Sequence, residues 1–478
     1  MLLDTTNPPS YYDTAAIIYN RDYFFLENIF SPLLEYSAGN EIVSGIAERF
    51  EWVGNEARFK MRTDLKTVDG LPINAIDAEQ SLKRLFILGG SGYGFLSKLL
   101  CGKTALMSLQ DPCPGLQVSD NGQNLVMKFA ERKTFLFHLL TNITYAVIPR
   151  GSIDQKTFKI NDYRNTSGPY YVNAYPGAGN IKLKANPFHY HYSDKIPQNI
   201  KIIAFTKYLK NEEILGMLSD KTIDYLRISA VLKPEDKVDF VAANPGYNIH
   251  LSRPVRMLFV LFTERGRRRL SREERFFIAR KLRGLYPLRR RMLEIPDQIF
   301  QMEGGLSKMQ LREIQALLNT GAEVVLKKKV EAKRLYSYFW LDGDEIKKWM
   351  PKVEYQDLYP PKSSKVVHEP DFYLFGCDMG FQDDVGLLAY YLDMDFFSMT
   401  PAEKGKWFAD YIASQDKNAR MRMIQALQYK TLYDARALPI GLLPYASVAR
   451  KPWAFNYPPA IAGDALWRLR RNLKWTLK

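Results

Sequence analysis

Histidine and cysteine are the residue types here with the most direct chemical uses. The chain has 478 residues, with five His and three Cys. His189 and His191 are two residues apart, a spacing that places both rings on one face of a strand and could hold a metal ion. Because the remaining histidines are scattered along the chain, we expect no metal site and no histidine-based acid–base catalysis.

The cysteines are Cys101, Cys113 and Cys377, and they form no CxxC or Cys/His pattern, which excludes a structural zinc site. Cys101 and Cys113 either close a short loop as a disulfide or remain buried thiols, and the sequence leaves both open. In an exported protein that disulfide would add about 2–3 kcal/mol of stability. There is no nucleophile elbow, GxGxxG or Walker loop and no clear carboxylate pair, so we expect a protein that is not an enzyme and needs no cofactor.

The chain is basic, with 67 Lys and Arg against 52 Asp and Glu, a net charge of +15. The charge is densest over residues 265–291, with arginine triplets at 267–269 and 289–291. Between them, Ser271 and Glu274 form a capping-box pattern that predicts an amphipathic helix. We interpret the basic residues as mostly its solvated face, and a docking surface for an acidic partner as the alternative. No nucleic-acid-binding signature is present, so we expect no nucleic-acid partner.

The composition is that of an ordinary globular protein, with 46% hydrophobic and 25% charged residues. The longest tight apolar run, residues 257–262, is the length of a strand and far below the roughly 18 residues of a membrane span. We therefore expect no integral membrane protein. No signal peptide is recognisable at the start, so the protein is either cytosolic or has lost a leader.

Short strands and helices alternate along the chain. Residues 50–53 and 57–62 predict a hairpin, and Asn74 is a candidate N-cap for a helix over 74–84. Further helices are predicted over 21–36 and 211–218, a loop over 351–370, and strands over 124–129, 180–185, 199–205, 222–226 and 257–262.

Several segments occur in an order that is typical of one family. They are LDTTNPPSYYD (3–13), NIFSPLLEY (28–36), IAERFEW (46–52), FKMR (59–62), DGLPINA (69–75), DAEQSLKR (77–84), TSGPY (166–170), ANP (185–187) and residues 372–388. The chain resembles the family-5 extracellular solute-binding proteins, which are the dipeptide, oligopeptide and nickel-type receptors of ABC importers. The block spanning 59–84 is the most specific part of this resemblance.

The resemblance implies an α/β fold of the periplasmic-binding-protein type 2 (class II) kind. Two lobes with mixed sheets flanked by helices would form a clamp on a two-segment hinge, with an extra inserted domain. The implied regions are 1–40, 167–250 and 455–478 for lobe I, 41–166 for the inserted domain II and 251–454 for lobe II (domain III). The hinge segments would lie near 251–256 and 448–455.

The resemblance also implies an anchor for the ligand. In peptide-binding members a cleft aspartate pairs with the α-amino group of the ligand, since a buried ammonium needs a carboxylate partner. Asp378 takes that position, with Gly376 and Cys377 beside it. Phe375 stands where the family usually has tryptophan, and Asp383-Asp384 replaces its Asp/Glu-Pro pair. The alternative is that Asp378 is a loop or capping residue.

Two further segments complete the implied binding site. Tyr93, within a glycine-rich loop, falls near a position where peptide receptors place a tyrosine over the ligand. Ile18, Tyr19 and Asn20 follow the first strand, where family members pair their backbone with an extended peptide. The alternatives are an ordinary loop aromatic and a segment without a ligand role.

The function that the resemblance implies is that of an extracytoplasmic receptor of an ABC importer. It would capture a peptide or peptide-like ligand between its lobes by hinge closure and deliver it to the permease subunits. We expect a monomer, periplasmic or lipid-anchored outside the cytoplasmic membrane. The alternative function is a ligand-sensing adaptor with the same fold and no transport role.

Overall fold

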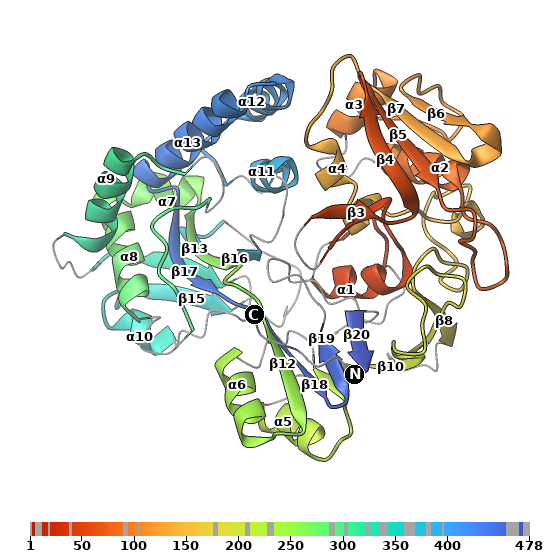
Figure 1. Cartoon of the computed structure of the whole chain (residues 1–478). Helices are drawn as coiled ribbons and strands as arrows, with labels where there is room; N and C mark the ends of the chain where they lie inside the picture. Colours follow the sequence, from red (N-terminus) through yellow and green to blue (C-terminus); the bar gives the residue numbers. More distant parts are fainter. Residues whose placement is uncertain are drawn as a thin grey trace.

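A computed structural model of the chain describes residues 2–4, 12–17, 20–37, 41–88, 94–103, 105–174, 180–205, 211–226, 234–285, 292–300, 305–321, 326–334, 343–357, 369–378, 384–393, 396–455 and 468–471. Three larger sheets organise these residues (Figure 1). They have seven, five and four strands, and the described residues also form two separate strand pairs. No described helix has both the length and the apolar character needed to cross a membrane.

The seven-stranded sheet combines strands from both ends of the chain. The strand β1 (Leu2–Asp4) pairs in parallel with its two neighbours, and the remaining pairs are antiparallel. In sheet order the strands are β12 (Tyr247–Leu251), β18 (Ala446–Arg450), β11 (Tyr225–Leu226), β1, β10 (Asn199–Phe205), β9 (Ile181–Ala185) and β8 (Tyr170–Ala174). The helices α1 (Asn20–Ile29), α5 (Asn211–Ser219) and α6 (Pro234–Ala243) belong to this part of the chain.

The five-stranded sheet is built around β13 (Arg256–Phe262), which has a neighbouring strand on each side and whose residues are all buried. It pairs antiparallel with β16 (Phe372–Asp378) and β17 (Ala437–Leu443), and the parallel strands β14 (Val330–Arg334) and β15 (Val353–Asp357) extend the sheet beyond β16. Its helices are α7 (Glu264–Arg269), α8 (Arg272–Leu285), α9 (Lys308–Asn319), α10 (Gly343–Lys347), α11 (Asp384–Asp393), α12 (Pro401–Ala413) and α13 (Lys417–Tyr433).

The four-stranded sheet is antiparallel, and α2 (Ala75–Leu88) packs on it. Its strands in order are β4 (Ala47–Val53), β5 (Glu56–Met61), β7 (Asn124–Lys128) and β6 (Leu116–Ser119), and it also carries α3 (Gly94–Cys101) and α4 (Leu136–Leu139). The two strand pairs are β2 (Leu34–Tyr36) with β3 (Ile42–Ser44), and β19 (Trp453–Phe455) with β20 (Leu469–Arg471). Short 3-10 turns span Asp120–Gly122, Ile143–Tyr145 and Arg150–Ser152.

The chain passes twice between the seven-stranded and the five-stranded sheet. The first crossing joins β12 to β13, and the second joins β17 to β18. The two crossings are bonded to each other: the Ser252 amide donates to the Tyr445 carbonyl at 2.9 Å, and the Tyr445 amide donates to the Ser252 hydroxyl at 2.8 Å. The first crossing lies within the expected 251–256. The second lies at residues 444 and 445, earlier than the expected 448–455, because β18 already belongs to the seven-stranded sheet.

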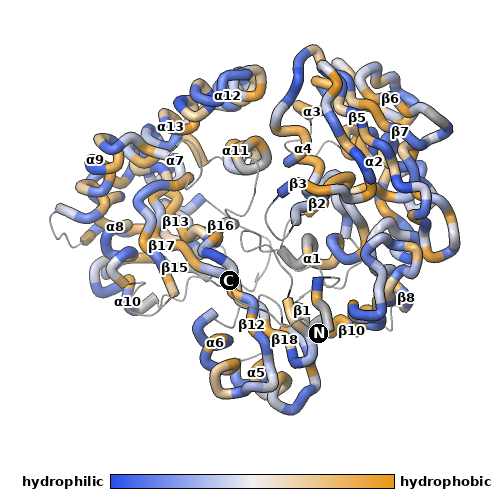
Figure 2. The backbone as a smooth tube through the Cα atoms, viewed as in Figure 1, coloured by the Kyte–Doolittle hydropathy of each residue, from blue (hydrophilic) through white to orange (hydrophobic). Residues whose placement is uncertain are grey.

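The α/β two-lobed fold class expected from the sequence is confirmed, with mixed sheets flanked by helices. The predicted division into domains at 1–40, 41–166, 167–250, 251–454 and 455–478 stays a prediction. Figure 2 shows hydrophobic residues concentrated along the central strands, as a buried core requires.

Most predicted elements agree with the structure, including the 50–62 hairpin, the helix after Asn74 and the strand over 257–262. One predicted helix is too long. It was expected over 21–36, but α1 ends at Ile29 and Leu34–Tyr36 forms β2. Leu33 and Leu34 are buried like the residues of the helix, so the apolar pattern continued past the turn and concealed it.

The basic segment differs from the expected solvated helix face. The capping box of Ser271 and Glu274 is present, but Arg275 and Arg283 of α8 are only 8% and 6% exposed. The Arg275 guanidinium donates to the carbonyls of Leu270, Asp434 and Ala435. These two arginines therefore serve packing, because each satisfies buried backbone oxygens that would otherwise lack partners.

The arginines of α7 are also used internally. Arg265 forms a two-pronged ion pair with Glu331, with both N–O distances 2.6 Å, and Arg269 contacts both carboxylate oxygens of Asp371 at 2.9 Å. Asp371, immediately before β16, is completely buried, so these pairs fix α7 against β14 and the start of β16. The triplet at 289–291 lies outside the described residues.

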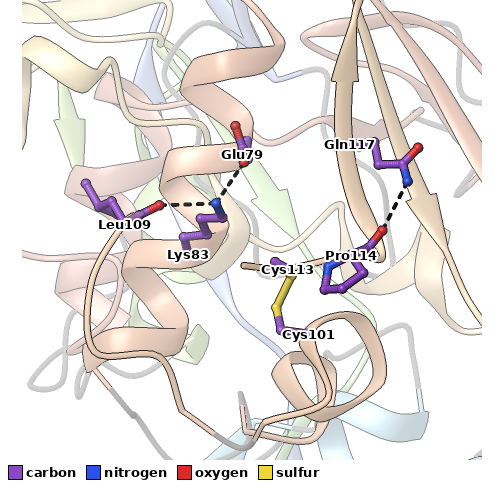
Figure 3. Close-up of a disulfide and its surroundings, with 7 residues drawn as sticks. All are labelled: Glu79, Lys83, Cys101, Leu109, Cys113, Pro114 and Gln117. Atoms are coloured by element: carbon purple, nitrogen blue, oxygen red, sulfur yellow. Dashed lines mark hydrogen bonds and ion pairs between the residues drawn. A yellow bond between two sulfur atoms is a disulfide. The ribbon is translucent and has the colours of Figure 1, made fainter. Parts of the chain in front are cut away.

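The disulfide left open by the sequence is formed between Cys101 and Cys113 (Figure 3). It joins the last residue of α3 to the segment that leads into β6. The same loop is held by Lys83 of α2, whose ammonium donates to the Leu109 carbonyl at 3.1 Å and pairs with Glu79 at 3.0 Å. The disulfide and the buried lysine stem together fix α3 on the four-stranded sheet.

Replacing Cys101 with serine should lower the free energy of unfolding by about 2–3 kcal/mol, because the unfolded chain regains the freedom of a short closed loop. Urea unfolding followed by circular dichroism measures the change. Met107→Ser is the matched control, since Met107 lies in the same loop with 84% of its surface exposed. Equal stabilities of the Cys101→Ser variant and the wild type would contradict the structural role of the disulfide.

Candidate functional site

The residues expected to anchor the ligand lie at the end of a strand beside the sheet crossing. Phe375, Gly376, Cys377 and Asp378 are the last four residues of β16, and Gly376 is buried. In the ladder with β13, Asp378 lies directly opposite Arg256. The backbone of β16 therefore places the expected anchor at the strand ends of the five-stranded sheet. The chain crosses to the other lobe from these same ends.

Arg256 is the first residue of β13 and lies at the same end of the sheet. It is 5% exposed, and its guanidinium carbon lies 4.8 Å from the centre of the Tyr445 ring, a cation–π contact. In the ladder with β17 it lies opposite Leu443, the residue that accepts a hydrogen bond from the Val255 amide. One buried arginine is thus in contact with the second crossing and adjacent in the sheet to the end of β16.

The other expected site residues are only partly described. Ile18, Tyr19 and Tyr93 lie outside the described residues. Asn20 is the first residue of α1, and Gly94, immediately after Tyr93, is the first residue of α3. The expected roles of all eight site residues therefore remain predictions.

Residues 77–84, the last part of the most specific sequence block (59–84), have a structural explanation. Asp77, Ser81 and Arg84 lie on α2 and bond to segments outside the four-stranded sheet. The Ser81 hydroxyl accepts from the Ile148 amide at 2.7 Å, and Asp77 accepts from the Arg150 amide at 2.9 Å. Burial raises the pKa of Asp77, although the backbone amides of Arg150 and Asn74 that donate to it act against the rise. Polar residues of α2 therefore fix the segment that returns from the four-stranded sheet.

Arg84 is the strongest of these connections. It is 1% exposed and pairs with Asp13, which lies in the segment between β1 and α1. Its guanidinium also bonds the Phe158 carbonyl, and Asp13 accepts in addition from the Ile160 amide at 3.2 Å. A buried ion pair with these extra partners joins three distant segments, and removing either charge would leave the other uncompensated.

The TSGPY motif at 166–170 is a packing device as well. Gly168 lies so close to the end of α1 that a Cβ there would come within 2.3 Å of the Ile29 carbonyl carbon. Its amide donates to the Ile29 carbonyl at 2.9 Å, and the Ser167 hydroxyl accepts from the Ser31 amide at 3.1 Å. Glycine is required because no side chain fits at this approach.

The His189 and His191 pair forms a buried polar cluster with Glu35. Nε2 of His189 contacts the Ser31 hydroxyl at 3.1 Å, and its Nδ1 accepts from the His191 amide at 3.1 Å. His191 contacts Glu35 at 2.8 Å, and the Tyr190 hydroxyl donates to Glu35 at 2.5 Å. Within the described residues, no group of three or more His, Cys, Asp and Glu is arranged to hold a metal ion.

The electrostatics of this cluster follow from its burial. Burial, with the nearby charges of His191 and Arg62, lowers the pKa of His189 well below its ordinary value. Burial alone would raise the pKa of Glu35, but His191, Arg468 and Tyr190 outweigh it and lower that pKa. His189 is therefore neutral and Glu35 ionised near neutral pH, consistent with an Nδ1 that accepts a hydrogen bond.

The cluster predicts a loss of stability in mild acid. The unfolded chain takes up a proton on His189 near pH 6.5, and the folded chain does not, so stability falls as the pH drops below that value. His189→Gln should reduce the slope of unfolding free energy against pH between about 6.5 and 5, by up to about 1.4 kcal/mol per pH unit. Urea unfolding at several pH values measures it.

Tyr192→Phe, in the same loop, is the control, since it changes an aromatic side chain that is 44% exposed and leaves His189 in place. An unchanged slope for His189→Gln would show that His189 is not held neutral by the fold.

The partners of this cluster were not found from the sequence. Arg62 lies 4.4 Å over the Tyr190 ring, and Arg468 donates to the Tyr36 carbonyl at 2.8 Å. The sequence predicts Glu35 to lie in the helix over 21–36, and that prediction does not indicate its burial. The only available signal was an acidic residue within an apolar run, NIFSPLLEY, which is expensive to bury unless paired.

Comparison with known proteins shows that solved structures share this fold. No protein-family model matches the sequence, and no curated protein sequence matches it. Among solved structures, the periplasmic oligopeptide-binding protein OppAIV of Borrelia burgdorferi is 16% identical, with a TM-score of 0.74, and the match covers 98% of this chain and 99% of that one.

Two further structures are similar to the same extent. The murein tripeptide binding protein MppA of Escherichia coli is 14% identical with a TM-score of 0.72, covering 98% of this chain and 97% of that one. The binding protein AgaA from A. tumefaciens R10, solved with agropinic acid, is 15% identical with a TM-score of 0.73, covering 100% of this chain and 98% of that one. These matches show that the whole chain adopts the two-lobed fold of such proteins.

Proposed function

We propose that this protein is the extracytoplasmic solute-binding receptor of an ABC importer. It captures a peptide or peptide-like ligand between its two lobes, closes on its hinge and delivers the ligand to membrane permease subunits. The observation that carries the proposal is the two-crossing connection between the seven-stranded and five-stranded sheets, in a fold matched along its whole length by binding proteins. We propose further that the protein works as a monomer.

The hinge is suited to this role because the crossings are short and are bonded to each other. A rotation of a few backbone dihedrals in residues 252–255 and 444–445 would move the five-stranded sheet as one body. The pair of hydrogen bonds between Ser252 and Tyr445 keeps the two crossings together, so they would bend as a unit.

Export is supported by the Cys101–Cys113 disulfide, since disulfides persist in oxidising compartments and are rare in the cytosol. We therefore propose a location outside the cytoplasmic membrane, either in a periplasm or at a lipid-anchored cell surface.

The peptide part of the proposal rests on the position of Asp378. The similar structures include a murein tripeptide binding protein and a binding protein solved with agropinic acid, so equal similarity of fold accompanies different ligands. The distinguishing chemistry is a carboxylate for the ligand ammonium, which must be paired when water is excluded. Asp378 is the last residue of β16, at the end of the five-stranded sheet nearest the hinge. This position is compatible with a contact to the ligand ammonium.

Native mass spectrometry of the purified chain tests the ligand class. A mixed population of bound peptide masses is expected, because backbone pairing and one charged anchor do not depend on the ligand side chains. A single bound mass that fragments without amino-acid losses would overturn the peptide proposal, although the receptor fold would remain.

The Asp378→Asn variant tests the anchor. The affinity for free-amine peptides released from the wild-type protein should fall by about 30-fold or more, since an unpaired ammonium would be buried. N-acetylated versions of the same peptides should lose little affinity. Isothermal titration calorimetry measures both.

Asp410→Asn is the matched control, since Asp410 is an exposed carboxylate on α12 that pairs with Lys406. If Asp378 instead serves only as a partner for Arg256, Asp378→Asn would lower the unfolding free energy and leave the affinity unchanged.

A further inference from the structure

Two aromatic residues connect the outer ends of the four-stranded and five-stranded parts of the molecule. Phe95 lies on α3, and Phe408 lies on α12. Their ring centres are 5.3 Å apart and their planes are perpendicular, the edge-to-face arrangement that aromatic pairs prefer. Figure 1 shows α3 and α12 at the same end of the molecule, far from the crossings between the sheets.

Aromatic contacts within each part of the molecule order the surroundings of the two rings. Phe95 also packs edge-on against Phe135, at 5.9 Å. On α12, Trp407 stacks on Tyr411 at 5.3 Å with only 11° between the planes, and Tyr411 is completely buried. The contact therefore joins two prearranged surfaces, and little side-chain freedom is lost when they meet.

The helices that present the rings are themselves fixed. α12 begins with a full capping box, in which Thr400 and Glu403 bond to each other's backbone amides, and with Pro401 in its first turn. α3 ends at Cys101, which is tied by the disulfide to Cys113. Both rings are thus carried on elements that move with their lobes.

A second contact lies on the same side. The Gln415 side-chain amide, just beyond α12, donates to the Glu131 carboxylate at 3.2 Å. Phe95, Phe408 and Trp407 also pack against one hydrophobic cluster whose buried residues come from both 33–147 and 257–443. If the lobes separated at this end, these apolar rings would enter water, which costs free energy in proportion to the area exposed.

We propose that Phe95 and Phe408 form a latch that holds the lobes closed and so sets how long a ligand is retained. This inference rests on the proposed function as a closing clamp, but it does not depend on which ligand is bound. The latch favours the closed arrangement even without ligand, which lowers the free energy that ligand binding must supply for closure.

Small-angle X-ray scattering of the full-length protein, freed of bound molecules by unfolding and refolding, tests the latch. The wild type should scatter as the closed molecule. Phe408→Ala and Phe95→Ala should each shift the closed-to-open ratio by about 3- to 10-fold toward open and increase the radius of gyration. The double variant should shift it little further than either single variant, because each removes the same contact.

Phe188→Ala is the control, since Phe188 is an aromatic residue that follows β9 of the seven-stranded sheet, with 42% of its surface exposed. Phe408→Leu, which keeps apolar bulk without a ring, replaces the alanine variant if that variant fails to fold. An open wild type, or latch variants that scatter like the control, would overturn the proposal. Because no ligand is added, a failure of the peptide proposal would leave this outcome unaffected.

Discussion

The constraint on which the rest of this structure depends is the pair of crossings that, in the described part of the chain, connects the seven-stranded and five-stranded sheets. They are bonded to each other through Ser252 and Tyr445, and Arg256 packs its buried guanidinium over the Tyr445 ring. A connection this narrow leaves the two sheets free to rotate about one line. Interactions between the lobes that lie far from that line therefore have a strong effect on the degree of closure.

The seven-stranded sheet is joined to the four-stranded sheet in a different way, by several buried contacts. Arg84 pairs with Asp13, Ser81 and Asp77 hold the returning segment, and Gly168 lets the end of α1 approach closely. The Glu35 cluster adds a further buried contact. Buried charges are costly unless they are fully paired, so these networks specify one arrangement. Such networks fix the seven-stranded and four-stranded sheets together, whereas the proposed hinge would let the five-stranded sheet rotate against them.

The sequence predicted the fold class and most elements because short strands and helices carry clear periodicity and the motif order spans the chain. It could not show that the arginines of α7 and α8 are partly internal, since a charge pattern does not reveal buried carbonyls such as those of Ala435 and Pro439. The Phe95–Phe408 contact was equally hidden, because it depends on the relative position of two lobes. The motif residues Arg84 and Gly168 were found, but their role is structural.

Hydrogen–deuterium exchange, with and without the peptides released from the purified protein, tests the central claim most directly. If a ligand is held between lobes that close on two crossings, amides of both the β16 end and the N-terminal part of α1 should gain protection together. The central strand β13 should remain unchanged, because its hydrogen bonds are already buried. Protection confined to one lobe, or none at saturating ligand, would contradict this account.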